Sequence, residues 1–243
     1  LFMFDQNSIN LLVLKERAYN LRWATVPEDV IPLTAADPDF KSAPEIAEAI
    51  SNYASDRYLC YGPAEGLPSF RESVSKFYQK RRDVPADPRF VLAVDSAAFG
   101  IFLICQAFLK KGDEAIIFDP VDFLFRYSIE ACDSRAVPFA IPQGTGVDFD
   151  RLEKLITAKT RMICLCNPLN PTGKVFTREE LQKLGEIAVK HDLLIMSDEI
   201  WSDIVFSPHT YTSMAALGEE IRNRTIIVTG YSKSYGLAGL RIG

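Results

Sequence analysis

The 243-residue sequence predicts a three-layer α/β/α domain with a mainly parallel central sheet. After the Asp87-Pro88 dipeptide, short apolar runs alternate with amphipathic helical segments, as in parallel sheets whose strands are covered on both faces. Hydrophobic residues make up 48% of the chain and charged residues 24%, which is typical of a globular domain and excludes a disordered or fibrous chain. The runs expected to form strands are F-V-L-A-V, E-A-I-I-F, A-V-P-F-A, R-M-I-C-L-C, L-L-I-M-S and T-I-I-V-T.

An N-terminal arm and crossing segment is expected to precede this domain over residues 1–43. The first 40 or so residues are expected to be irregular, with Pro27, Pro32 and Pro38 as breakers of regular structure. The domain itself is expected to span residues 44–243.

Helix start signals lie ahead of several amphipathic segments. A helix should begin at Pro44, with the Ser42 hydroxyl available as its cap, and a second should run from Pro68 to Arg82. Thr177 and Glu180 form a capping-box pattern at the start of another. The expected helices between the strands include A-A-F-G-I-F-L-I-C-Q-A-F-L, F-D-R-L-E-K-L-I and T-R-E-E-L-Q-K-L-G-E-I-A-V-K, the last of which begins with this capping box.

Composition and charge exclude several classes of function. The net charge of -5 comes with no basic run, so nucleic-acid binding is not expected. The longest apolar runs are far shorter than the roughly 20 residues that cross a bilayer, and the first residues carry no secretory signal, so we expect a cytoplasmic protein. Two histidines and no G-x-G-x-x-G motif after a strand argue against a serine hydrolase, a histidine metal site and a nicotinamide enzyme.

The five cysteines form an odd set that lies mostly within apolar stretches, so we expect buried thiols rather than disulfides. Cys164 and Cys166 share one face of an expected strand, but further metal ligands near them are not evident, so no metal site is predicted. His191, near an expected helix end, is interpreted as a charged surface residue.

Polar residues follow the expected strands at the edge where a parallel sheet binds its ligands, so one pocket could contain them. Asp198 ends an otherwise apolar strand, where an unpaired carboxylate is costly to bury. It is therefore expected to pair with a cation, unless it caps a helix or pairs with a surface lysine. The residues at these strand ends are Ser96, Asp119, Phe123, Asn167, Asn170, Asp198, Ser232 and Lys233.

Two further motifs lie at strand ends. In T-G-Y-S-K-S-Y-G-L-A-G-L-R-I-G, Lys233 and Arg241 flank a glycine-rich turn, which fits a lysine bonded to a ligand beside an arginine that binds the ligand's anion. In C-N-P-L-N-P-T-G, two X-Pro bonds can be cis and fix a sharp turn that aims an asparagine amide into the pocket, with an ordinary turn as the alternative.

Along the chain, the motifs strand-N-P-x-N-P-T-G, strand-D-E and S-K-x-x-G-L-x-G-x-R-x-G follow one another. At these separations the three together closely resemble the fold-type I pyridoxal-phosphate aminotransferases. The resemblance runs from about Asp37 to Gly243 and implies that the domain is the cofactor-binding large domain of that family. It implies that Lys233 forms a Schiff base with pyridoxal 5'-phosphate and then shuttles a proton, as both anchor and base. Asp198 would pair with the pyridine nitrogen, and Asn170 would donate to the ring's phenolate oxygen.

The same resemblance implies a set of ligands for the cofactor phosphate. Ser232 and Arg241 would bind it, together with Ser96, Ala97 and Ala98, where backbone N–H groups at the start of a helix favour an anion. Tyr61 matches a tyrosine that reaches the phosphate of the neighbouring subunit, so a homodimer with shared active sites is implied.

Three positions depart from the usual pattern of the family. Gly230 stands where a serine hydroxyl commonly binds the phosphate, so one hydrogen bond worth about 1 kcal/mol is missing there. Trp201 takes the place of a tyrosine that donates to the phenolate oxygen. The aromatic residue that stacks on the ring usually lies two positions after a proline, whereas here Pro120 is followed by V-D-F, and Phe123 is the expected stacking residue. Its alternative role is that of a core aromatic on the following helix.

The expected activity is that of an aminotransferase acting on an L-amino acid and a 2-oxo acid. The segments D-V-I-P-L-T-A-A-D-P-D-F and S-D-E-I-W-S-D-I look most like a branch that includes cystathionine β-lyase-like C–S lyases, and both reactions begin with the same carbanion. The C-terminal small domain of the family is expected to be absent, with the large domain truncated near Gly243. A cofactor-binding module without turnover is therefore the third alternative.

Overall fold

The computed structural model describes residues 9–142 and 144–243. These residues form two compact units. The larger unit contains Gly62–Gly230 and the last two residues, Ile242–Gly243. The smaller unit contains the described residues up to Tyr61 together with Tyr231–Arg241. The domain boundary expected after residue 43 stays a prediction, because compact units and domains need not share their limits.

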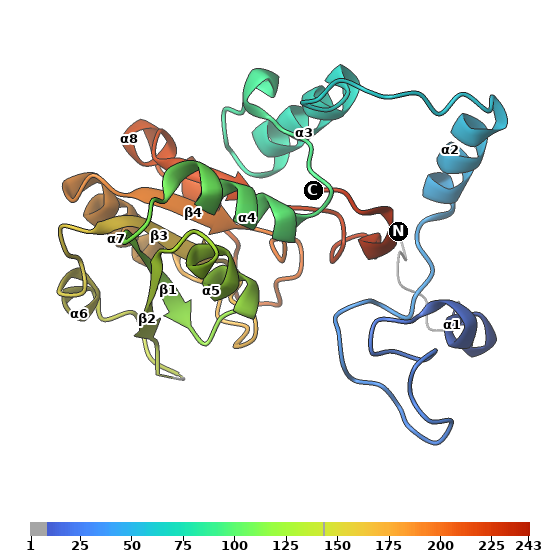
Figure 1. Ribbon diagram of the computed structural model, residues 1–243, viewed down its shortest axis with the longest axis horizontal. Coiled ribbons are helices and arrows are strands. Elements are labelled where there is room, and N and C mark those ends of the chain that lie inside the picture. The colour runs from blue at the N-terminus through green and yellow to red at the C-terminus, as the bar shows by residue number, and fades with distance from the viewer. Residues whose placement is uncertain (1–8, 143) are drawn as a thin grey trace. The chain divides into compact units, whose positions relative to one another are not determined.

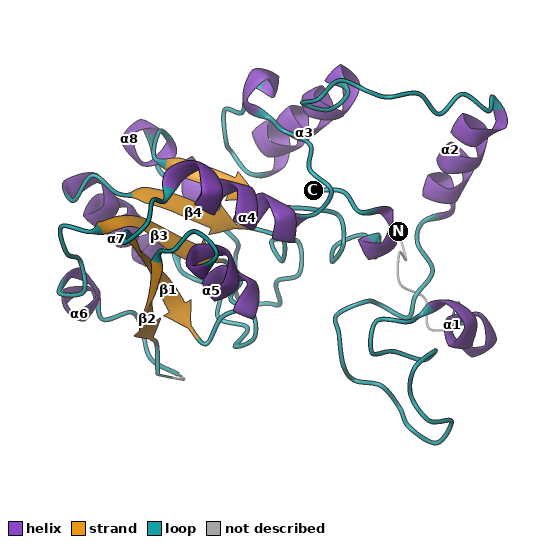
Figure 2. Ribbon diagram, viewed as in Figure 1, coloured by secondary structure: helices purple, strands orange, loops and turns teal. Residues whose placement is uncertain are grey.

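The larger unit is built on a five-stranded sheet in the order β2-β1-β3-β4-β5, and every neighbouring pair is parallel (Figure 2). Apolar runs form these strands, as the sequence predicted, and the three central strands β1, β3 and β4 are almost entirely buried, whereas the edge strands β2 and β5 are partly exposed. The strands are β1 (Glu114–Asp119), β2 (Arg135–Ala140), β3 (Thr160–Cys166), β4 (Leu194–Asp198) and β5 (Thr225–Val228).

The strand expected in F-V-L-A-V is wrong. Its beginning belongs to a short 3-10 helix, η2 (Pro88–Phe90), and the following residues are irregular. Val94 exchanges both backbone hydrogen bonds with Gly243, each 2.9 Å long, but Ala93 donates instead to the carbonyl oxygen of Glu65. The apolar run therefore makes one residue pair rather than a ladder.

Helices cover both faces of the sheet, which confirms the three-layer fold. Figure 1 shows α4 and α5 in front of the sheet and α7 behind it. α4 packs on α5, and residues of both contact the sheet. The helices of the larger unit are α3 (Pro68–Arg81), α4 (Ala97–Phe108), α5 (Phe123–Glu130), α6 (Phe149–Glu153), α7 (Arg178–Lys190) and α8 (Glu219–Arg222), with a 3-10 helix η3 (Met214–Ala216) before α8.

The capping box at the start of α7 is confirmed. The backbone N–H of Glu180 donates to Thr177 Oγ1 at 3.1 Å, and Glu180 Oε2 accepts from the backbone N–H of Thr177 at 3.0 Å. Further along α7, Gly185 allows a close approach to α8, because a Cβ atom at this position would lie 2.4 Å from Cδ1 of Ile221. The start and the packing face of α7 are therefore both specified by local residue choice.

The smaller unit contains α1 (Leu11–Arg17), α2 (Pro44–Ser55) and a 3-10 helix η4 (Ala238–Leu240). The expectation that the first 40 or so residues are irregular is wrong at α1, where the Asn10 side chain accepts a hydrogen bond from the backbone N–H of Val13. The expected Ser42 cap is also wrong. Ala43 occupies the N-cap position of α2, and no side chain caps that helix.

Contacts of Arg22 and Gly236 organise the smaller unit. Arg22 is buried, donates to the carbonyl oxygens of Pro32 and Thr34, and forms an ion pair with Asp39. Gly236 has a φ of +66°, and a Cβ atom there would lie 2.8 Å from Cγ of Pro38. Only glycine combines that backbone conformation with such a close approach.

No helix in the described ranges is long and apolar enough to cross a membrane. The five cysteines are free. Cys105, Cys164 and Cys166 are buried as expected, but Cys60 is exposed.

Candidate functional site

The strand order places a topological switch point between β1 and β3. The chain passes from β1 to β2 on one side and then returns across β1 to β3 on the other. In a parallel sheet of this kind, the loops that leave the two strands diverge and open a crevice at the carboxyl edge. The residues that follow β1, β3 and β4 therefore define the candidate site.

Asp198 is the last residue of β4 and is only 6% exposed. Its backbone carbonyl oxygen accepts a hydrogen bond from the backbone N–H of Asn167, just after β3, at 3.0 Å. Its Oδ1 atom accepts from the backbone N–H of Ile200 at 3.1 Å. The carboxylate is thus held at the edge of the sheet by its own turn and by the neighbouring strand.

Glu199 is a buried acid next to Asp198 that the sequence analysis did not single out. Its side chain is 0% exposed, and its Oε1 accepts hydrogen bonds from Ser197 Oγ, Ser213 Oγ and the backbone N–H of Met214, at 3.2, 2.8 and 3.3 Å. Burial raises the pKa of Glu199, although the hydrogen bonds from the serine hydroxyls act in the opposite direction. The sequence signal that could have identified Glu199 is its position as a second acidic residue at the end of an apolar strand.

Two tyrosines lie in the same buried region as Glu199. Burial raises the pKa of Tyr78 and of Tyr211, and the charge of Glu199 raises both further. The guanidinium of Arg82 lies 4.9 Å from the ring centroid of Tyr211 and forms an ion pair with Asp203. Behind the strand end there is therefore a polar cluster that connects β4 to α3 and to the segment before η3.

The N-terminus of α4 offers backbone donors near the carboxyl edge. Ser96 is the N-cap residue, and its Oγ accepts from the backbone N–H of Phe99 at 3.1 Å. The N–H groups of Ala97 and Ala98, in the first turn, have no acceptor within the helix. A Cβ atom on Gly243 would lie 2.6 Å from the backbone nitrogen of Ala97, so the glycine leaves this helix end free of a side chain. Such an end favours a small anion.

The asparagine motif after β3 forms the turn that the sequence predicted, since the Asn167-Pro168 and Asn170-Pro171 bonds are both cis. The Asn167 side chain serves the fold, because it donates to the carbonyl oxygen of Thr212 at 3.3 Å and accepts from the backbone N–H of Phe176 at 3.1 Å. The Asn170 amide is half-buried, and its Nδ2 donates to Asp122 Oδ2 at 3.2 Å. Asp122 follows β1 and was not singled out from the sequence, although a polar residue before F-L-F-R-Y is a cap signal.

The two aromatic candidates lie in different environments. Phe123 is the first residue of α5 and is 76% exposed, so the alternative role as a core aromatic is not supported, whereas Phe125 is 0% exposed. Trp201 is half-buried and packs against the main hydrophobic core. Their contacts with a cofactor ring stay predictions.

The remaining site residues belong to the smaller unit. Ser232 and Lys233 lie in a turn and are half-buried. Arg241 has a φ of +53° and donates from Nη1 to the carbonyl oxygen of Ala238 at 3.1 Å, and Tyr61 is fully exposed. The larger unit thus contains Ser96, Ala97, Ala98, Asn170 and Asp198. That these residues form one site together with Lys233 stays a prediction.

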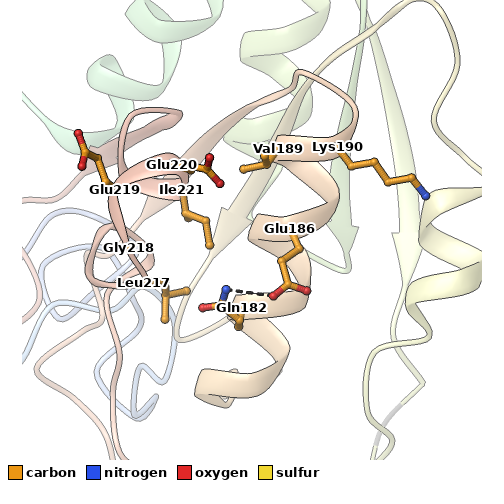
Figure 3. A pocket seen from close by; sticks show the side chains of 9 residues that line it. All are labelled: Gln182, Glu186, Val189, Lys190, Leu217, Gly218, Glu219, Glu220 and Ile221. Carbon is orange, nitrogen blue, oxygen red and sulfur yellow. Dashed lines mark hydrogen bonds between the residues drawn. The ribbon is translucent and has the colours of Figure 1, made fainter.

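A separate cleft of about 350 Å³ lies between α7 and α8 (Figure 3). Its lining includes three glutamates and Lys190, above the apolar side chains of Leu217 and Ile221. Gln182 donates to Glu186 within the cleft at 3.1 Å. None of the candidate site residues lines it.

The sequence matches the family model described as aminotransferase class I and II over residues 28–243. The aspartate aminotransferase of Bacillus sp. (strain YM-2) is 32% identical over 219 residues, which cover 88% of this chain and 55% of that protein. The asparagine–oxo-acid transaminase of Streptococcus mutans is 32% identical over 220 residues, which cover 88% of this chain and 56% of that protein.

Solved structures give the same result. The crystal structure of cystalysin from Treponema denticola, which contains a pyridoxal 5'-phosphate cofactor, matches with a TM-score of 0.86 and 27% identity over 94% of this chain and 60% of that chain. The aromatic aminotransferase from Pyrococcus horikoshii OT3 matches with a TM-score of 0.85 and 30% identity over 89% of this chain and 59% of that chain. The chain therefore spans little more than half the length of the relatives it matches.

Proposed function

The chain belongs to the class I and II aminotransferase family, and we propose that it uses pyridoxal 5'-phosphate to transfer an amino group from an L-amino acid to a 2-oxo acid. The observation that carries this proposal is the buried Asp198 carboxylate at the end of β4, next to the switch-point crevice. A carboxylate at this position suits a protonated pyridine nitrogen, because the negative charge stabilises the bound proton.

The larger unit fits the other parts of this cofactor. The first turn of α4 offers the N–H groups of Ala97 and Ala98 to a phosphate. The Asn170 amide would donate to the ring oxygen. Trp201 and Phe123 are proposed to contact the ring, and Ser232 and Arg241 to complete the phosphate site.

The chemistry is divided between the cofactor and the chain. Bound pyridoxal phosphate supplies a conjugated ring that accepts the electron pair of a broken bond at the substrate's Cα atom. Asp198 would keep a proton on the pyridine nitrogen. Lys233 would hold the cofactor through Nζ and, once displaced by the substrate amine, would move a proton with the same atom.

A homodimer with shared sites is part of the proposal. In the smaller unit, α1 and α2 contain no buried residue, and Leu33 and Tyr61 are 91% and 107% exposed. An arm with so many exposed apolar side chains is suited to packing against a second copy of the chain. Mixing Tyr61→Phe and Lys233→Ala chains tests shared sites, because one kind of site in the hybrid would then regain both residues. We also propose that the protein is cytoplasmic, because its five cysteines are free thiols and the cytoplasm keeps thiols reduced.

Reconstitution with pyridoxal 5'-phosphate tests the proposed function. The expected result is a new absorption band of the covalently held cofactor and glutamate formation from an amino acid and 2-oxoglutarate. Lys233→Ala should abolish the band, whereas Lys80→Ala, on the exposed surface of α3, should keep it. An unchanged band in Lys233→Ala would overturn the assignment of the anchor. Pyruvate and ammonia from cystathionine without glutamate formation would assign a lyase, and a band without turnover would assign a cofactor-binding module.

A further inference from the structure

Asp122 and Asn170 connect the two loops that border the switch-point crevice. Asn170 follows β3 and donates from Nδ2 to Oδ2 of Asp122, which follows the neighbouring strand β1, at 3.2 Å. The second carboxylate oxygen, Oδ1, accepts from the backbone N–H of Leu124 at 3.1 Å and caps α5. The carboxylate is therefore fixed by the helix and in turn contacts the Asn170 amide.

We propose that Asp122 is a positioning residue that fixes the orientation of the Asn170 amide toward the candidate site. An asparagine side chain presents a donor and an acceptor of similar shape, so the amide alone does not determine which of the two faces a ligand. A carboxylate only accepts hydrogen bonds, so it selects the NH2 side. Hydrogen bonds to a charged acceptor are also stronger than those between neutral groups.

The orientation has a consequence for the ligand. One hydrogen of Asn170 Nδ2 is taken by Asp122, which leaves the second hydrogen for an oxygen of a bound molecule. That the oxygen belongs to the ring of pyridoxal phosphate rests on the proposed function. Asp122 itself stands two positions after Pro120, where the resembled family usually has the stacking aromatic residue, so in this chain that position binds the Asn170 amide instead.

Three variants separate positioning from helix capping. Asp122→Ser keeps a side chain that caps a helix but is too short to reach Asn170. Asp122→Asn keeps the length of the side chain but has a single acceptor oxygen, so it can accept from the backbone N–H of Leu124 or from Asn170 but not from both. Asp148 caps α6 in the same way, with its side chain accepting from the backbone N–H of Arg151, so Asp148→Ser is the matched control for a change of cap alone.

The first measurement is the NMR signal of the Asn170 side-chain NH2 group in the full cofactor-free chain, assigned by its loss in Asn170→Ser. The two protons of an amide NH2 group always have distinct shifts, and in the wild type the proton bonded to the carboxylate is expected downfield of its position in a free asparagine side chain. This downfield shift should be lost in Asp122→Ser, be reduced in Asp122→Asn and stay unchanged in Asp148→Ser. An unchanged Asn170 signal in Asp122→Ser would overturn the positioning role.

The second measurement is the dissociation constant of pyridoxal 5'-phosphate for the same variants. Asp122→Ser should weaken binding roughly five-fold or more, as expected for the loss of one oriented hydrogen bond, and Asp148→Ser should leave it unchanged. Loss of the downfield NMR shift with unchanged affinity would overturn the link between Asp122 and this ligand. A wild-type chain that does not bind the cofactor would refute the proposed function instead, while the NMR signal still decides the role of Asp122.

Discussion

The carboxylate of Glu199 accepts a hydrogen bond from the Ser213 hydroxyl at 2.8 Å, which connects the end of β4 to the first residues of η3. The same oxygen, Oε1, also accepts from Ser197 and from the backbone N–H of Met214. Glu199 thus holds the residues on both sides of the loop that leaves Asp198.

Removing this acceptor should destabilise the chain. Glu199→Ala is expected to have a free energy of unfolding about 2–4 kcal/mol below that of Glu199→Gln, because it leaves buried donors without an acceptor. Both variants lack the charge, so urea unfolding of this pair isolates the hydrogen bonds. Equal stabilities would mean that water or a rearranged loop satisfies the donors.

The raised pKa of Glu199 predicts a pH dependence with a definite sign. The folded state retains the proton to a higher pH than the unfolded state, whose ordinary pKa is 4.5. Its contribution to stability is fully present below pH 4.5 and is lost as the pH rises through the folded-state pKa. The difference in unfolding free energy between wild type and Glu199→Gln should therefore fall as the pH rises above 4.5. A difference that increases over that range would contradict the raised pKa.

The contact between Gly185 and Ile221 predicts a coupled pair. Gly185→Ala should destabilise the chain by about 1–3 kcal/mol, because the new methyl group meets the end of the Ile221 side chain. Ile221→Ala should cost about 2–4 kcal/mol by itself, since that side chain is buried. The double variant should be destabilised by less than the sum of the two single variants, because the methyl group fills space left by the isoleucine. Strict additivity in a double-mutant cycle would show that the helices separate instead.

The cysteines should differ sharply in reactivity. Burial raises the pKa of Cys105 to about 12, so only roughly one thiol in ten thousand is ionised at pH 8. Iodoacetamide at that pH should modify the exposed Cys60 in the folded chain and leave Cys105, Cys164 and Cys166 unmodified until urea is added. Mass spectrometry identifies the sites, and Cys60→Ser should remove the rapid modification. Rapid modification of Cys105 without urea would mean that the core opens easily.

Much of the fold could be predicted because buried parallel strands leave a simple signal. Five of the six expected strands are present, and the Thr177 capping box starts α7 as expected. The failure at Val91 to Val94 has a physical reason, since the apolar run is neither buried nor paired along its length: Leu92 is 56% exposed, and only Val94 forms a residue pair, with Gly243. The helix α1 was missed because the prolines that predicted an irregular arm, from Pro27 onward, all come after this helix and say nothing about it.

Sequence reasoning could propose a site residue only where the position of that residue relative to its own strand was enough to suggest a role. Asp198 and Asn170 could be singled out because they lie at the end of one apolar run and shortly after another. Asp122 and Glu199 were missed because their roles depend on partners in other loops. An acid at a helix start or after another acid has many ordinary explanations until its partner is known.

The central position of β3 also determines which part of the molecule resists local opening. It lies between β1 and β4, and Met162–Cys166 are all buried, so its amide hydrogens should exchange with solvent almost only through global unfolding. The exposed α1 and α2 belong to the opposite extreme and should exchange quickly in the isolated chain. Asn167 and Asn170 follow the most protected strand, so the geometry of their turn should persist for as long as the chain stays folded.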